Sequence, residues 1–287
     1  MKDVAIGQLY PVDSPIHRLD PRVKFVVTIA YIVMLFFAQS FILFGIITVG
    51  LIAVIFLSRI PLSKVLRSIR FIIFLLVFTF IITLLLNKGE GAEAEIAKYG
   101  YYLSFGPFTI CGTGLLNAGK LCTRLILIVV GPTLLTLTTS PTDLTEAIAW
   151  ILSPFKLIRL PVHEFAMIMS LALRLVPTVM EETEKIMNAQ KARGASFDHG
   201  NIFKRAGALV PVLVPLFVNS MKRSDELANA MESRCYRGAK GRTKMKKLRF
   251  RFKDVFAFFL FALFMFFILM VACNWFGWEW CVFLNTY

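Results

Sequence analysis

The sequence predicts an all-α integral membrane protein. Apolar residues make up 57% of the 287 positions, Phe alone occurs 28 times, and the mean hydropathy is +0.70. A soluble domain of this size rarely carries so much apolar material. Several apolar runs also approach the roughly 20 residues that a helix needs to cross a bilayer. We therefore expect about five transmembrane helices, joined by three amphipathic helices on the cytoplasmic side.

The expected spans follow one another along the apolar runs, with polar residues 59–70 forming a loop between the second and the third. They are Val23–Gln39, Phe41–Leu57, Phe71–Leu86, Leu121–Thr138 and Val255–Cys273. The first twenty residues are polar, so no cleavable signal pattern is expected.

Lys and Arg set the expected orientation. They are frequent before the first span, in residues 59–70 and in residues 140–254, but rare after the third span, and they are absent from the C-terminal tail. The positive-inside rule therefore places the N-terminus in the cytoplasm and the C-terminus outside the cell. The basic cluster at 240–253 is best interpreted as a topology signal in contact with anionic lipid. No recognition module accompanies the formal charge of +14, which argues against nucleic-acid binding.

The chain should divide into a four-helix membrane region (1–138), a cytoplasmic region (139–253) and a last transmembrane helix with a short external tail (254–287). In the cytoplasmic region, Ser140 or Thr142 can cap a short helix that runs to about Leu152. Two longer helices are expected at Val162–Ala192 and at about Ile202–Tyr236, each roughly 45 Å long. Each begins apolar and ends charged.

The apolar halves of these two long helices make poor lipid-facing spans, because they are short and interrupted by Arg or proline. Three prolines mark places where the helices could bend: Pro177, Pro211 and Pro215. The halves could form an interfacial platform or a surface for another membrane protein. Small or adaptable side chains suit both roles. The candidate contact residues are Met167, Met169, Ala172, Ala208 and Met221.

Both long helices end in the pattern Ala-x-x-(Ala/Ser)-Arg-(Gly/Cys). Helix termination alone explains one such end, because Arg suits the helix dipole and glycine suits the position after the last turn. Two copies at equivalent places favour docking of two similar soluble partners, with small side chains that permit close approach and an arginine fork that suits a carboxylate. The candidate docking residues are Ala189, Ala192, Arg193, Gly194, Ala230, Ser233, Arg234 and Cys235.

The chain resembles the transmembrane T component of energy-coupling factor transporters, the EcfT family of ECF-type ABC transporters. Four segments, spread over essentially the whole chain, carry the resemblance. They are His17–Lys24, Leu137–Leu144, Ala192–Gly194 and Glu232–Tyr236. The second motif departs from the family pattern, with Ser-Arg-Cys in place of Ala-Arg-Gly. Since Cys235 accepts a left-handed backbone less easily than glycine, Gly238 is an alternative end for that helix.

The resemblance implies a scaffold with coupling helices on the cytoplasmic side. Arg193 and Arg234 would dock into two ATPase subunits, while other surfaces hold an exchangeable membrane subunit that binds a vitamin or another micronutrient. The partners would bind ATP and Mg, whereas this non-catalytic chain would bind no cofactor. Closure of the ATPases would draw the two helix ends together, bend the helices at their prolines and tilt the substrate-binding subunit.

Other functions find less support in the residues. An enzyme would need carboxylate pairs, a His cluster or a metal motif, and the spans contain no Asp, Glu or His. The cysteines and histidines lack metal-ligand spacing, so no metal site is expected. Gly114–Leu121 fits GxxxxGK but lacks the final Ser or Thr of a phosphate-binding loop. The alternative that remains is a self-contained multi-pass permease with its own substrate path.

Two questions stay open at the level of sequence. Lys120 and Arg124 could snorkel to the interface or pair inside the bundle with Glu93 or Glu95. Cys273 and Cys281 could pair outside the membrane, although free thiols are favoured.

Overall fold

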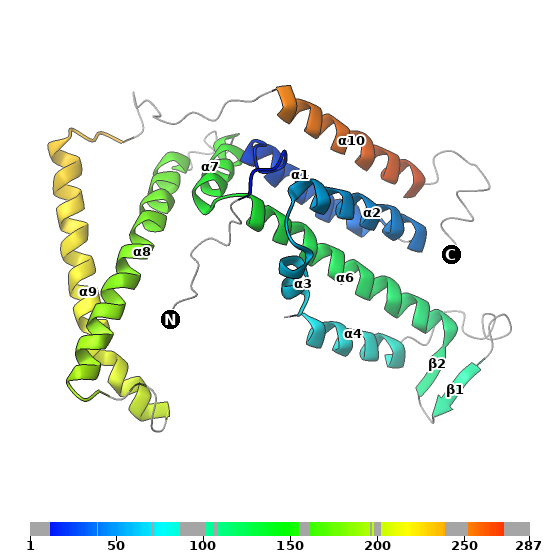
Figure 1. The fold of residues 1–287 in the computed structure, drawn as a ribbon, viewed down its shortest axis with the longest axis horizontal. Helices are drawn as coiled ribbons and strands as arrows, with labels where there is room; N and C mark the ends of the chain where they lie inside the picture. Colours follow the sequence, from blue (N-terminus) through cyan, green and yellow to red (C-terminus); the bar gives the residue numbers. More distant parts are fainter. Residues whose placement is uncertain are drawn as a thin grey trace. The chain divides into compact units, whose positions relative to one another are not determined.

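A computed structural model describes residues 12–38, 40–70, 72–86, 101–105, 108–154, 161–195, 197, 202–238 and 252–272. The helices are α1 (Pro21–Phe37), α2 (Phe41–Ser58), α3 (Leu62–Arg70), α4 (Ile73–Leu86), α6 (Gly112–Thr138), α7 (Pro141–Ile151), α8 (Val162–Ala192), α9 (Ile202–Ser233) and α10 (Phe252–Ala272) (Figure 1). The expected all-α membrane class is confirmed. A short antiparallel hairpin, β1 (Tyr101–Phe105) and β2 (Phe108–Cys111), adds to it.

The chain divides into two compact units. One comprises residues 1–6 and 145–247, and the other comprises residues 7–144 and 248–287. The second, which we call the membrane unit, contains α1 to α6 and α10. The first, which we call the coupling unit, contains α8 and α9. The functional division at 138/139 and 253/254 stays a prediction.

Length and composition make four of the described helices candidates to cross a membrane. They are α2, residues 114–138 of α6, α8, and residues 252–271 of α10. A fifth candidate combines α3 with residues 73–84 of α4, which are bent by 56° relative to each other. Helix α1, with 17 residues, lies at the short end of the spanning range. Helix α8 meets the length and composition criterion although its second half is charged, so its place outside the bilayer stays a prediction.

The structure corrects three element boundaries. Residues 62–70, expected in a loop, form helix α3, and α4 begins at Ile73 rather than at Phe71. Helix α6 begins at Gly112, nine residues before the expected span, so the GxxxxGK segment is helical and is not a phosphate-binding loop. The sequence places the end of α9 at Tyr236 or Gly238, which is wrong, because α9 ends at Ser233.

The core of the membrane unit forms where α1, α2, α6 and α10 meet. Helix α6 packs on both α1 and α2, and α10 packs on α1. Apolar side chains that share a face on each helix supply the buried cluster. Its largest fully buried members are Phe44, Met34, Leu35, Leu43, Ile47 and Ile268.

Helices α1 and α6 approach closely at Gly131. A Cβ atom built there would lie 2.5 Å from Cε1 of Tyr31, well inside van der Waals contact. The Tyr31 hydroxyl donates a hydrogen bond to the carbonyl of Leu127 at 3.1 Å, which fixes the ring against α6. Only glycine therefore fits at position 131 without displacing a buried, hydrogen-bonded ring.

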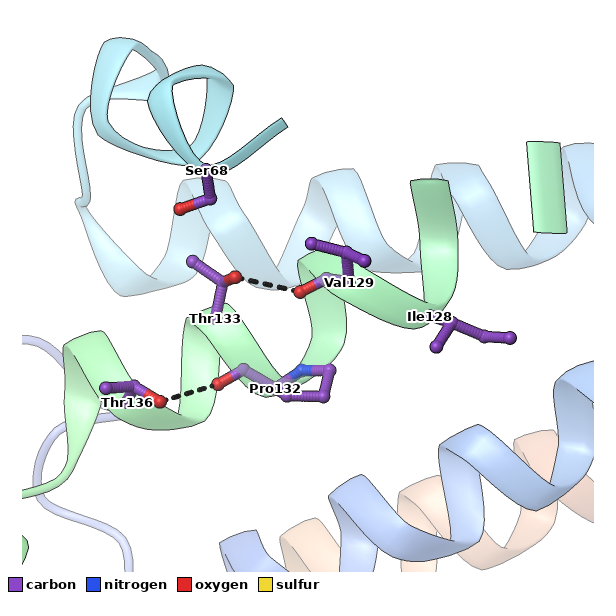
Figure 2. Close-up of a pocket in the computed structure, with 6 residues that line it drawn as sticks. All are labelled: Ser68, Ile128, Val129, Pro132, Thr133 and Thr136. Atoms are coloured by element: carbon purple, nitrogen blue, oxygen red, sulfur yellow. Dashed lines mark hydrogen bonds between the residues drawn. The ribbon is translucent and has the colours of Figure 1, made fainter. Parts of the chain in front are cut away.

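A cavity of about 380 Å³ lies between α3 and α6 (Figure 2). Val65 anchors α3 in the core with 4% of its surface exposed, and Ile69 packs beside the same cluster. The cavity lies beside this anchor and is lined by Ser68, Ile128, Val129, Pro132, Thr133 and Thr136.

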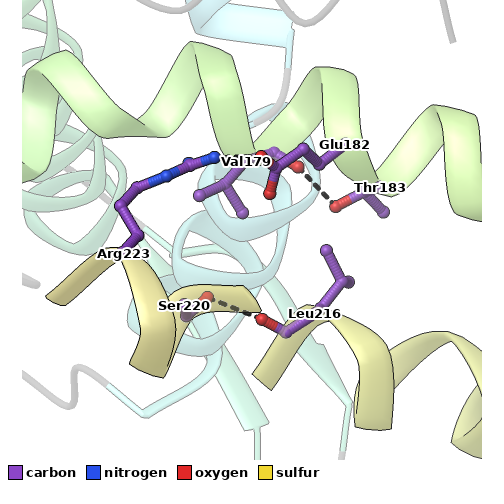
Figure 3. Close-up of polar contacts among 6 residues, drawn as sticks. All are labelled: Val179, Glu182, Thr183, Leu216, Ser220 and Arg223. Carbon is purple, nitrogen blue, oxygen red and sulfur yellow. Dashed lines mark hydrogen bonds and ion pairs between the residues drawn. The ribbon is translucent and has the colours of Figure 1, made fainter. Parts of the chain in front are cut away.

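In the coupling unit, α8 and α9 pack as an antiparallel pair. The Arg223 guanidinium of α9 forms an ion pair with the Glu182 carboxylate of α8 (Figure 3). Further along, the Gln190 side-chain amide donates to the carbonyl of Pro211 at 3.4 Å. Because residue numbers fall on α9 as they rise on α8, the two chains run in opposite directions. Figure 1 shows α9 bending in the half that carries two prolines.

Candidate functional site

Helix α8 ends in a left-handed cap. Gly194 has a φ of 89°, a conformation that glycine adopts without steric cost. Its N–H donates to the carbonyl of Lys191 at 3.0 Å, and the Ala195 N–H donates to the carbonyl of Gln190 at 3.0 Å. These two bonds define the Schellman motif, which satisfies carbonyls that would otherwise be left open at a helix end. Arg193 is consequently the last residue before the chain turns away.

Helix α9 ends in the same way. Cys235 takes the place of Gly194, with a φ of 56°, and its N–H donates to the carbonyl of Glu232 at 2.8 Å. The Tyr236 N–H donates to the carbonyl of Met231 at 3.0 Å. Each bond has its counterpart in α8 at the same offset. The two motifs thus share a backbone structure as well as a residue pattern.

All eight candidate docking residues are exposed at these ends. Ala189, Ala192, Arg193 and Gly194 lie on the last turn and cap of α8. Ala230, Ser233, Arg234 and Cys235 lie at the corresponding places on α9. The Ser233 hydroxyl donates to the carbonyl of Ala230 in its own helix at 3.0 Å, so this side chain stays close to the backbone of α9. The structure therefore presents each arginine beside small side chains at a helix terminus.

The antiparallel packing separates the two ends. Gln190, near the end of α8, contacts Pro211, and the helix then continues from Pro211 to the end of α9 at Ser233. At ~1.5 Å rise per residue, the two arginine motifs are roughly 30 Å apart along the pair. One small partner surface cannot contact both ends at once.

The apolar halves of α8 and α9 leave large side chains exposed. Among the candidate contact residues, Met169 is 36% exposed and Met221 53% exposed. Ala172 is also exposed, while Met167 and Ala208 are partly buried. Sequence reasoning missed larger members of the same surface, although the apolar run from 206 to 218 could have indicated them. They are Leu209, Val210, Leu213, Val214 and Phe217.

The structure places all three candidate hinge prolines inside continuous helices. Pro177 lies in α8, and Pro211 and Pro215 lie in α9. Each removes one backbone donor from its helix, which leaves the preceding turn easier to bend. Their role as hinges stays a prediction.

Relatives of known class match almost the whole chain. A family model described as "Cobalt transport protein" (CbiQ) matches residues 13–245. A protein of Thermosediminibacter oceani named energy-coupling factor transporter transmembrane protein EcfT is 46% identical, covering 90% of this chain and 94% of its own. Proteins with the same name from Heliobacterium modesticaldum and Ruminiclostridium cellulolyticum are 44% and 42% identical, over 88% and 89% of this chain and 92% of each relative.

The chain belongs to the EcfT family. It is the transmembrane component of an energy-coupling factor transporter and a multi-pass membrane protein. It therefore works within a complex that contains other subunits.

The N-terminal motif of this T component builds a buried polar cluster in the membrane unit. Asp20 caps α1 by accepting the Arg22 N–H at 2.9 Å, and its own N–H donates to the Asp254 carboxylate of α10 at 2.9 Å. The Lys24 ammonium donates to the carbonyls of His17 at 3.2 Å and Thr138 at 2.9 Å. The cluster therefore ties the starts of α1 and α10 to the end of α6.

Sequence reasoning did not connect these residues, because Lys24 and Thr138 are 114 positions apart and Asp20 and Asp254 are 234 apart. It did offer Ser140 or Thr142 as the cap of α7, and the structure selects Ser140, whose hydroxyl accepts the Asp143 N–H at 3.1 Å.

Arg124 has a role that neither sequence interpretation described. Its guanidinium donates to the carbonyl of Ala38 at 2.6 Å, just after α1, and lies 5.5 Å from the centre of the Phe44 ring. The Lys120 ammonium lies 5.4 Å from the centre of the Phe41 ring. Both cations thus contact aromatic faces on α2. Glu93 and Glu95, the ion-pair candidates, lie outside the described residues, as do Cys273 and Cys281.

Within the described ranges, no three His, Cys, Asp or Glu side chains come together in a way that could hold a metal ion.

Proposed function

We propose that this T component joins two cytoplasmic ATPase subunits to an exchangeable substrate-binding membrane subunit, for uptake of vitamins or other micronutrients. The observation that carries the proposal is the matched pair of helix ends, in which Arg193 and Arg234 occupy equivalent places beside left-handed caps. Two copies of one local structure suit two copies, or two homologues, of one partner.

The chemistry of each end supports docking into a groove. The Schellman bonds satisfy two of the carbonyls that a helix end leaves open, which lowers the cost of burying that end in a partner surface. Exposed Ala189 and Ala192, and likewise Ala230 and Ser233, allow a partner backbone to approach closely. The arginine fork can then form two parallel hydrogen bonds with a carboxylate, an arrangement that lysine does not reproduce.

The separation of the ends supports two partners. Ends that lie roughly 30 Å apart on an antiparallel pair can each serve one subunit of an ATPase dimer. A change in the distance between those subunits would act directly on α8 and α9. Pro177, Pro211 and Pro215 are the places where these helices would bend in response.

The exposed apolar surface supports a membrane partner. Phe217 is 67% exposed and Leu213 is 60% exposed on α9, and Ile168 is 59% exposed on α8. Exposed apolar side chains of this kind suit contact with another membrane protein or with lipid. Met167, Met169, Ala172, Ala208 and Met221 are the adaptable members, which suits exchange between different substrate-binding subunits.

The remaining assignments follow from the same scaffold role. The N-terminus would face the cytoplasm and the C-terminus the exterior, as the distribution of Lys and Arg indicates. The ATPase partners would bind ATP and Mg and hydrolyse ATP, and this chain would be non-catalytic.

Co-purification tests the proposal. The chain is produced together with its ATPase pair and a substrate-binding subunit, solubilised and analysed for stoichiometry. The Arg193→Glu/Arg234→Glu variant should lose both ATPases, because reversed charges repel the partner carboxylates. Each single variant should retain one docking point and yield a weaker complex.

A matched variant controls for charge. Lys185→Glu/Lys222→Glu reverses two exposed cations on the same helices, away from their ends, and should assemble normally. Normal assembly and transport by the Arg193→Glu/Arg234→Glu variant would refute docking. If the unaltered chain forms no complex while all subunits are folded, a self-contained permease becomes the better explanation.

A further inference from the structure

The cavity between α3 and α6 has an apolar wall with little free hydrogen-bonding capacity. Ile128, Val129 and Pro132 contribute carbon atoms. The hydroxyls of Thr133 and Thr136 donate to carbonyls of their own helix, at 2.8 Å to Val129 and 3.0 Å to Pro132 (Figure 2). An apolar ligand segment is therefore favoured along most of this wall.

Two polar features remain in the lining of the cavity, one on each helix. Ser68 contributes a hydroxyl from α3. Pro132 has no N–H, so the carbonyl of Ile128 lacks the donor that an α-helix normally supplies from four residues ahead. Ser68 can donate a hydrogen bond to the polar end of a ligand, whereas the Ile128 carbonyl can only accept one.

Helix α3 has the composition of an interfacial helix. Leu62 and Leu66 are 48% and 60% exposed on one side of α3, Lys64 and Arg67 occupy other faces, and Arg70 lies one turn after Leu66 at the edge of the apolar side. Val65 holds the helix to the core. A helix with an apolar side and a basic side lies in the headgroup region and is attracted to anionic lipid.

The depth of the cavity agrees with that position. Thr136 lies two residues and Ile128 ten residues before the last residue of α6, or roughly 3 and 15 Å along the helix axis. The headgroup layer of a bilayer is roughly 5–8 Å thick on each side. With the end of α6 at the outer edge of the headgroup layer, the cavity would extend from headgroup depth into the acyl region.

Lys64 lies one turn before Ser68, so both residues share a face of α3. Arg70 lies nearly opposite to Ser68 around the same helix.

We propose that the α3–α6 cavity binds an anionic phospholipid of the surrounding bilayer. One acyl chain occupies the wall formed by Ile128, Val129 and Pro132. The phosphate accepts hydrogen bonds from the Ser68 hydroxyl and the Lys64 ammonium. The site belongs to the membrane unit and does not depend on the docking arginines of the coupling unit.

Native mass spectrometry of the purified full chain tests this site. The chain is titrated with phosphatidylglycerol or phosphatidylcholine that carry identical acyl chains. We expect phosphatidylglycerol to be retained preferentially. Lys64→Gln should weaken its binding about fivefold, as loss of one basic residue near a lipid phosphate predicts.

Matched variants distinguish a specific lipid site from a general electrostatic attraction between α3 and anionic lipid. Arg70→Gln removes the same charge from the other side of α3 and should change binding less than about twofold. Ser68→Leu fills the cavity and should reduce retention of both lipids. Should Ser68→Leu fail to fold, the comparison of Lys64→Gln with Arg70→Gln decides alone.

Three results would overturn the proposal. Equal retention of the two lipids would show that the site does not select a lipid with a net negative charge. Equal loss in Lys64→Gln and Arg70→Gln would show a diffuse electrostatic effect. Displacement of phosphatidylglycerol by glycerol phosphate at equal concentration would assign the site to a free phosphate compound rather than to a bilayer lipid.

Discussion

Gly194 and Cys235 occupy the same position in two helix caps, and both have left-handed backbones with φ of 89° and 56°. The hydrogen bonds around them match at each offset. Glycine accepts this conformation freely, whereas a residue with a Cβ atom is strained by about 1–2 kcal/mol. The shared geometry is therefore maintained at α9 despite a residue that disfavours it.

Substitutions at these two positions should change stability in opposite directions. Gly194→Ala should destabilise the last turn of α8 by about 1 kcal/mol, because it introduces a Cβ atom at positive φ. Cys235→Gly should stabilise the last turn of α9 by less than about 1 kcal/mol, since glycine also gains freedom in the unfolded chain. Hydrogen exchange of the amides in each last turn measures both effects.

Cys235→Ser distinguishes the backbone from the thiol. Serine retains the Cβ atom, so exchange at the end of α9 should stay at the level of the unaltered chain. A stabilisation equal to that of Cys235→Gly would mean that the thiol, and not the backbone strain, sets the stability of this cap.

This pair also shows how far sequence patterns reach. The bounds of α8 follow from its sequence, because an apolar-to-charged helix is followed by Gly194 at the cap. The end of α9 does not, because Cys235 carries no local signal for a left-handed residue. The two cap hydrogen bonds hold Cys235 in a left-handed conformation that its side chain disfavours.

Other parts of the structure depend on contacts between residues that are far apart in the sequence, and a local sequence pattern does not predict such contacts. Helix α3 has only nine residues, three of them basic, and it is stabilised by Val65 in the core rather than by its own propensity. The acidic run at Glu181–Glu184 has the pattern of a solvated helix face, yet Glu182 pairs with Arg223 while Glu181 and Glu184 are exposed. Such a pairing requires the register of α8 against α9, which no single segment contains.

Gly131→Ala should destabilise the membrane unit by about 1–3 kcal/mol. The added Cβ atom would meet the Tyr31 ring at 2.5 Å, and the ring is held by its bond to Leu127. Thermal unfolding in detergent measures the loss. Gly45→Ala in α2 is the matched control, because no atom lies within 4 Å of its Cβ position. An equal loss of stability in Gly45→Ala would mean that the loss in Gly131→Ala does not come from the clash with the Tyr31 ring.

Lys24→Met should strongly destabilise the membrane unit. Asp20 and Asp254 are 6% and 2% exposed, and the positive charge of the Lys24 ammonium interacts favourably with both carboxylates. Removing one member of a buried charged group costs about 3–5 kcal/mol.

The control for Lys24 is Arg18→Met, which breaks an exposed pair with Asp13 at 3.6 Å and should cost less than about 1 kcal/mol. Thermal unfolding of the two variants gives the comparison. Equal, small losses would mean that the cluster near α1 is solvated in the membrane-bound protein.

The ion pair between Glu182 and Arg223 should set the register of α8 against α9. Both side chains are partly exposed, at 24% and 30%, so the pair should contribute no more than about 1 kcal/mol. Arg223→Glu should increase hydrogen exchange in the middle of both helices, and the exchanged pair Glu182→Arg/Arg223→Glu should restore protection. A double-mutant cycle isolates the interaction of the two side chains. If the exchanged pair is no more protected than Arg223→Glu alone, other contacts between α8 and α9 set the register, and the charges of this pair play no part in it.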